Sequence, residues 1–136
     1  MRLYATIAIS IGLTFLSAVA LANGGKYEVL DEEKVYYGNC SSFEKPATIS
    51  VDNIFPHIHA YKLIKERNLD ENDPEYWVLL MQANKVFRDA LKQVAVSKKY
   101  DLVAQCGAVR AVAPEVTIPD ITHLVVAEVE RNPEGR

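Results

Sequence analysis

The chain has 136 residues, a length that fits one domain with a modest hydrophobic core. Its 18 acidic residues outnumber its 15 basic residues, which gives a formal net charge of −3 at pH 7. Nucleic acids and anionic membrane surfaces select basic faces, so this balance argues against nucleic acid as a partner and offers little to a membrane.

The first 22 residues have the three parts of a cleavable signal peptide. Arg2 supplies a positive start, residues 3–21 contain no charge, and Ala20-Leu21-Ala22 places small residues where a signal peptidase reads. An uncleaved membrane anchor is the alternative, because a run of about 19 residues can span a bilayer. The small-residue exit favours cleavage. The segment therefore predicts an exported protein with no stable membrane insertion after cleavage.

Residues 23–46 form an N-terminal extension that is rich in charge and tyrosine and follows no clear hydrophobic period. At most one short strand is indicated, around residues 35–37. Cys40 lies in this extension, and Cys106 is the second cysteine of the chain. In an oxidising compartment an isolated pair most often forms one disulfide, so we expect a Cys40–Cys106 bond. Two free buried thiols, or a reactive thiol, are the alternatives.

A strand and two helices are predicted next along the chain. Residues 47–52 alternate apolar and polar, as in a half-buried strand. A first helix is expected from residue 55 to about residue 68, with Pro56 in its first turn. Asp73-Pro74-Glu75 has the cap, proline and acid of a helix start, and no further Gly or Pro follows until after residue 98. Residues 55–99 are therefore expected to form an antiparallel helical hairpin that protrudes as an arm with an acidic tip.

An apolar seam with steps of three and four residues runs along this predicted arm, a pattern typical of coiled-coil contacts. Two helices cannot bury such a seam by themselves, so the seam predicts a partner, either sister subunits or an apolar client segment. A polar residue within the seam, Asn84, would fix register or oligomer number. The seam comprises Tyr61, Trp77, Leu80, Asn84, Phe87, Leu91 and Val94.

Two strands and a short helix are predicted for the last third of the chain. Residues 100–105 and 108–112 flank Cys106-Gly107, which predicts a β-hairpin beside the first strand. Asp120 is placed to cap a short amphipathic helix, although the β-branched residues of this segment leave a strand as the alternative, and residues 132–136 are expected to fray. The predicted fold class is α+β, with a small β body, a protruding antiparallel helical hairpin and a short C-terminal helix. The expected core of the body, packed under that helix, is Ile49, Val51, Leu102, Val103, Val109 and Val112.

The residues predict neither a catalytic constellation nor a metal site. His57 and His59 are two residues apart and would point to different faces of a helix, and His123 is the only other imidazole. Residues 70–81 look superficially like a calcium loop, but they lack glycine at the sixth position and have Met81 at the twelfth. No nucleophile-elbow, zinc-protease or phosphate-loop motif is present. We therefore expect a protein that is not an enzyme and needs no cofactor.

Several short sequence motifs, in the order in which they occur along the chain, resemble the Skp/OmpH family of periplasmic chaperones. They are ISVDNIF at residues 49–55, ALKQVA at 90–95, KKYDLV at 98–103, the pair Ala108-Val109, and PDIT at 119–122. The most specific part is KYDLV at 99–103 with the later DIT at 120–122. The resemblance places an Skp/OmpH-like domain at residues 47–131, with its arm at 55–99.

The resemblance implies a periplasmic location, with an extracellular one second, and a trimer whose helical arms hold unfolded outer-membrane proteins. Here the predicted arm is far shorter than that family's, and its tip is acidic where the family tends to be basic, so the likeness supports the fold better than the activity. The function it implies is a non-enzymatic binding or assembly protein that forms a homo-oligomer and holds apolar segments of envelope proteins. A structural envelope component without chaperone activity is the alternative, followed by a small thiol-dependent protein.

Overall fold

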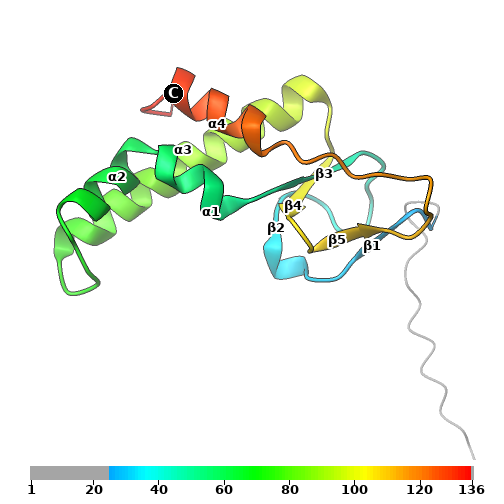
Figure 1. Ribbon diagram of the computed structural model, residues 1–136, viewed down its shortest axis with the longest axis horizontal. Helices are drawn as coiled ribbons and strands as arrows, with labels where there is room; N and C mark the ends of the chain where they lie inside the picture. The colour runs from blue at the N-terminus through cyan, green and yellow to red at the C-terminus, as the bar shows by residue number, and fades with distance from the viewer. Residues whose placement is uncertain (1–24, 136) are drawn as a thin grey trace, which may run out of the picture.

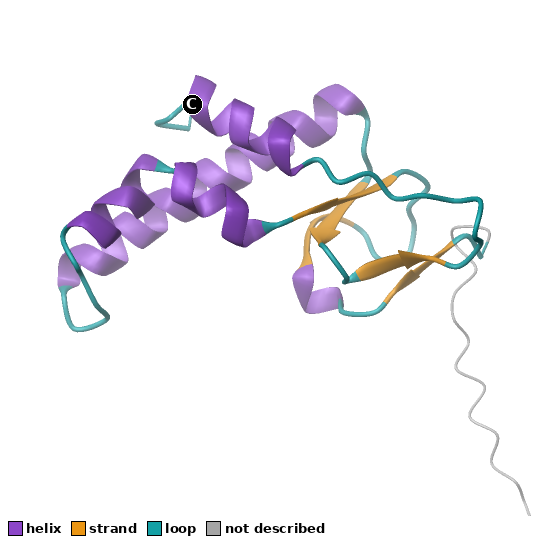
Figure 2. Ribbon diagram, viewed as in Figure 1, coloured by secondary structure: helices purple, strands orange, loops and turns teal. Residues whose placement is uncertain are grey.

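The computed structural model describes residues 25–135, so the predicted signal peptide lies outside the described residues. Helices gather at one end of the structure and strands at the other (Figures 1 and 2). The elements are, in order, β1 (Tyr27–Val29), the 3-10 helix η1 (Glu32–Lys34), β2 (Val35–Gly38), β3 (Pro46–Ile49), α1 (Val51–Ile54), the 3-10 helix η2 (Phe55–His57), α2 (His59–Glu66), α3 (Pro74–Lys98), β4 (Leu102–Gln105), β5 (Val109–Ala111) and α4 (Thr122–Arg131).

The described strands form two small sheets. In the larger sheet β4 lies between β2, which is antiparallel to it, and β3, which is parallel to it. The smaller sheet pairs β1 with β5 in antiparallel register. The segment before α4 covers the outer edge of β3, because the Thr48 amide donates to the Pro119 carbonyl at 2.9 Å and the Ile121 amide donates to the Thr48 carbonyl at 2.9 Å.

The prediction of a hairpin between the two late strands is wrong. Both strands exist, as β4 and β5, but each pairs with strands from the first half of the chain. The N-terminal extension supplies β1 and β2, and these occupy the pairing positions that the hairpin would have used. Residues 25–46 are therefore part of the fold, although only a weak strand signal at 35–37 indicated this.

The first predicted helix is broken into two pieces, η2 and α2, and α1 precedes it, beginning at positions that were predicted as the end of the first strand. Pro56 has no amide hydrogen to donate, so a regular helix cannot continue through it without losing a hydrogen bond. Two residues later Ile58 has an extended backbone (φ −84°, ψ 124°), and its side chain is fully buried. The break turns α2 so that Ile64 also reaches the core.

The second predicted helix and the C-terminal helix are confirmed as α3 and α4. Asp73 precedes α3, but its carboxylate accepts the Asp70 amide at 3.0 Å and makes no cap bond to the helix. The carboxylate of Asp120 does bond to the first turn of α4, accepting the Thr122 amide at 2.9 Å.

The protruding helical hairpin is not observed, and this part of the fold prediction is wrong. The structure has one long helix, α3, while α2 has only 8 residues. α2 packs against α3, and α4 also packs against α3 with Val125 and Val129 buried (Figure 1). Because α4 folds back onto α3, the helices form a packed layer rather than a free arm.

Two hydrophobic clusters lie on opposite faces of the larger sheet. Alternation along β4 explains this, since successive side chains point to opposite faces. Val103 joins Ile49 and the helices in the larger cluster, whereas Leu102 and Ala104 join Phe43 and Val109 in the smaller one. Of the six predicted core residues, Val51 is half-buried and Val112 is exposed; the other four are buried.

The end of the chain is ordered against α3. Residues 132–135, expected to fray, turn back so that the Gly135 carbonyl accepts a hydrogen bond from Lys85 Nζ at 2.7 Å. Gly135 is buried, and a Cβ at this position would lie 3.3 Å from the Cα of Val86.

Candidate binding surface on helix α3

The predicted seam divides into a buried half and an accessible half. Phe87, Leu91 and Val94 are buried in the larger cluster. Trp77 is 50% exposed, and the other three members are half-buried. Those three are Tyr61, Leu80 and Asn84.

The core-facing side of α3 is rotated from the predicted seam in its first half. The buried residues there are Leu79, Ala83 and Val86, which face α2 and α4 rather than a partner molecule. The first half of α3 has apolar residues on most sides of the helix, so periodicity alone permitted either face to be the buried one. The tertiary contacts of α2 and α4 decide which face is covered.

An outer stripe of α3 is left uncovered, and we define it as Trp77, Val78, Met81, Asn84 and Arg88. Val78 is 55% exposed and Met81 is 73% exposed. From Val78 onward these residues recur every three or four positions, and Trp77 lies four before Met81, so they share one side of the helix. The sequence prediction missed Val78, Met81 and Arg88. The apolar pair Val78 and Met81 has a helical spacing that runs beside the predicted seam.

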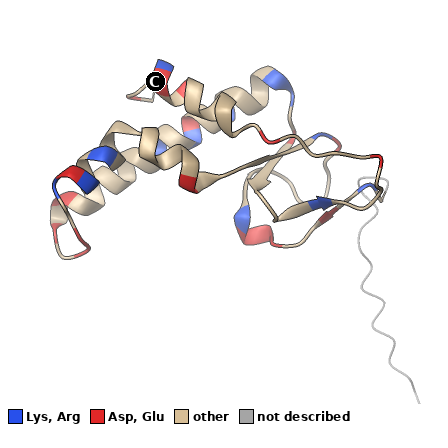
Figure 3. Ribbon diagram, viewed as in Figure 1, with Lys and Arg blue, Asp and Glu red and all other residues tan. Residues whose placement is uncertain are grey.

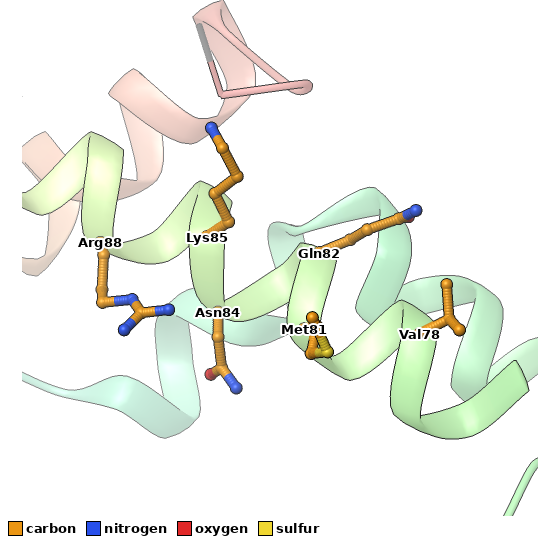
Figure 4. Close-up of a pocket in the computed structure, with 6 residues that line it drawn as sticks. All are labelled: Val78, Met81, Gln82, Asn84, Lys85 and Arg88. Carbon is orange, nitrogen blue, oxygen red and sulfur yellow. The ribbon is translucent and has the colours of Figure 1, made fainter. Parts of the chain in front are cut away.

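A shallow groove of about 470 Å³ follows this stripe. Figure 4 shows Asn84 and Arg88 extending from one side of α3 and Lys85 from the other. The residues that line the groove are Val78, Met81, Gln82, Asn84, Lys85 and Arg88.

A second hollow of about 280 Å³ adjoins the groove, because both share Asn84 and Arg88. Its floor is aromatic: the Phe87 ring lies 5.3 Å from Phe55 and 5.7 Å, edge-on, from Tyr36, measured between ring centroids. The accessible apolar surface therefore continues from the outer stripe to β2.

An acidic loop precedes the outer stripe. Residues 70–75 contain Asp70, Glu71, Asp73 and Glu75 and no basic residue. The Trp77 indole Nε1 donates to the Glu71 carbonyl at 2.9 Å, which holds the loop against the start of the stripe. Arg67 forms an ion pair with Glu75. It therefore neutralises only one of the four acidic residues of the loop.

Basic residues follow the stripe at its other end. Residues 84–99 contain five Lys and Arg residues and one acidic residue, Asp89. Lys85 bonds to Asp89 at 2.6 Å. Within residues 25–135, no ion pair is formed by Arg88 or Lys92. The stripe thus runs from an acidic end to a basic end, with an apolar centre (Figure 3).

The two cysteines are free thiols. Cys40 lies two residues after Gly38, and Gly38 pairs with Leu102 at the start of β4. Cys106 comes directly after the last residue of β4. They lie toward opposite ends of this strand, an arrangement that does not fit a bond whose Cα atoms must approach within about 7 Å. The expected Cys40–Cys106 disulfide is therefore absent from this fold.

Neither thiol has the environment of a nucleophile. Burial raises the pKa of Cys40, and Glu32 adds to the rise. Burial also raises the pKa of the Cys106 thiol; a hydrogen bond with Thr48 opposes this, and the Asp120 carboxylate, 3.5 Å away, adds to it. A thiol with a raised pKa is mostly protonated at neutral pH and reacts slowly. The hydrogen bond from Thr122 lowers the pKa of Asp120, which stays ionised beside Cys106.

The histidines do not come together. His57 Nδ1 lies 3.0 Å from Glu130 Oε1, an exposed contact between η2 and α4. Among the described residues no group of three or more His, Cys, Asp or Glu side chains is placed to hold a metal ion. Over the same part of the chain, no helix combines the length and the apolar character needed to cross a bilayer.

In comparisons with known proteins, no family model, curated protein or solved structure matches the chain. The outer stripe of α3 is consequently the feature from which a function is argued.

Proposed function

We propose that this chain is an exported, non-enzymatic binding protein of the Skp/OmpH type, which works in the periplasm and holds apolar segments of envelope proteins on the outer stripe of α3. The exposed, contiguous apolar residues of the stripe carry the proposal. Single exposed apolar residues are ordinary, but a clustered row with a groove is typical of interaction surfaces.

Burial is the expected source of affinity. Covering Trp77, Val78 and Met81 would remove apolar area from water at about 25 cal/mol per Å², less the cost of ordering the bound segment. Met81 is unbranched and polarisable, and such side chains adapt to bound segments of different shape. The surface therefore suits weak, sequence-tolerant binding.

The Skp/OmpH resemblance supports the class of protein, while the helical layer limits how it would work. That support comes from the short sequence motifs at residues 49–55, 90–95, 98–103 and 119–122. A protein without a protruding arm has no means of enclosing a client, so we propose contact with short segments along one helix face.

The proposal is tested by diluting a denatured outer-membrane protein into buffer with and without the chain and following aggregation by light scattering. We expect suppression by the native chain and clear loss of suppression in Met81→Glu, which places a charge at the centre of the stripe. Val96→Glu is the matched control, because Val96 is 59% exposed on the same helix but lies outside the groove. Absence of suppression by the native chain would favour a structural envelope role.

A further inference from the structure

We infer that, in the absence of a client, the outer stripe of α3 is covered by the same stripe of a second copy, with the two helices antiparallel about a two-fold axis near Met81. This inference rests on the proposed function, for which it names the resting partner of the binding surface, and it replaces the trimer that the Skp/OmpH resemblance implies with a two-fold dimer. A two-fold contact uses the same patch on both molecules, so the patch must be complementary to itself.

The apolar centre of the stripe satisfies this requirement. Met81 is the most exposed of its large apolar side chains, at 73%. In an antiparallel pair centred on Met81, residue 78 faces residue 84 of the other copy and residue 77 faces residue 85. Trp77 and Val78 of each copy would thus cover the other copy's groove beside Asn84 and the aliphatic stem of Lys85.

The charges at the two ends of the stripe select the antiparallel orientation. Arg88 lies seven residues after Met81, about 10 Å along the helix, and Pro74 lies the same distance before it. Arg88 therefore faces the other copy's acidic loop where that loop enters α3. Lys92, about 16 Å from Met81, faces the region of Glu71. A parallel pair would instead set acidic loop against acidic loop.

The structure prepares both ends for this contact. The hydrogen bond from Trp77 to the Glu71 carbonyl fixes the loop beside the stripe, so little ordering is required on association. Arg88 and Lys92 form no ion pair with the described part of their own chain. A second copy brings acidic partners to both.

Sedimentation equilibrium of the exported chain at low salt tests the inference through a charge swap. We expect a monomer–dimer equilibrium that weakens as salt is raised, because the end contacts are exposed. Glu71→Lys and Lys92→Glu should each weaken dimerisation about tenfold, since each change turns two symmetric attractions into repulsions. The double variant should recover to within about threefold of the native constant.

Lys62→Glu provides the matched control, because it reverses an exposed charge on α2 away from the stripe. The inference is overturned by a monomer at high concentration, by a trimer, or by a double variant that does not recover. These outcomes are separate from the aggregation assay. A monomer that suppresses aggregation removes the dimer and leaves the proposed function, whereas a dimer that fails to suppress does the reverse.

Discussion

Gly38 shows how a single residue closes the larger sheet. It is the last residue of β2, pairs with Leu102 and has a φ of +95°. A Cβ here would overlap the carbonyl oxygen of Asp101 and lie 2.9 Å from the Leu102 Cα. Both neighbours are backbone atoms, so neither can move aside cheaply.

Replacing Gly38 by alanine should therefore cost about 3 kcal/mol or more of unfolding free energy, the sum of the positive φ and the backbone overlap. Gly107→Ala is the matched control, since Gly107 has a φ of +89° but open space around its Cα. That variant should lose only about 1 kcal/mol. Urea titrations of both variants give the comparison, and equal losses would show that the overlap at Gly38 is relieved.

Asp101 illustrates a residue whose role the sequence could not reveal. The strand predicted at residues 100–105 included it, yet it lies just before β4 and is exposed. Its two carboxylate oxygens accept the backbone amides of Glu44 and Lys45, each at 2.7 Å. Because these partners are more than 50 residues away, no local pattern contains the information.

At the scale of elements, prediction succeeded where the determinants are local. Residues 74–98 carry their own start signal and an uninterrupted helical run, and α3 has those bounds. The helix ends at Lys99, which has a left-handed backbone (φ 61°). Prediction failed for the β4–β5 hairpin, since the turn at Cys106-Gly107 is compatible with a hairpin but the competing strands come from residues 27–38.

The two faces of α3 should differ sharply in their contribution to stability. Leu91, 1% exposed, belongs to the larger cluster, so Leu91→Ala should cost about 2–5 kcal/mol through lost burial and a cavity. Met81→Ala on the outer stripe should change stability by less than about 0.5 kcal/mol. Thermal and urea unfolding at a concentration where the chain is monomeric would measure both. A large loss in Met81→Ala would mean that the stripe is a structural surface.

At the scale of the whole molecule, the N-terminal extension packs with the predicted domain and supplies part of its sheet and core. Its β2 is one of the two neighbours of β4, and its Phe43 is 2% exposed in the smaller cluster. The strands of the extension could not be predicted from its composition, because short strands with little apolar alternation resemble a charged linker. The candidate site was predicted in part: the long helix, Trp77 and Asn84 were identified, but the exposed face of the helix depends on where α2 and α4 pack.

A chain that begins at residue 47, the predicted domain start, should consequently fail to fold. It would leave one edge of β4 unpaired and the smaller cluster open, exposing an apolar strand edge that favours aggregation. A chain of residues 23–136 should fold cooperatively. Circular dichroism with thermal melts on both chains is the measurement, and a cooperative melt of the shorter chain would contradict this account of the core.

The strand pairing also has a consequence for a chain that is delivered from its N-terminus, as in synthesis or export. Tyr27 pairs with Ala111, Val35 with Ala104, and Ile49 with Gln105. Every strand of the first half therefore waits for a partner beyond α3, and loop closure over such separations is slow. Until residue 105 or later has emerged, β1, β2 and β3 have no partner. Both sheets are thus completed only after most of the chain has been delivered.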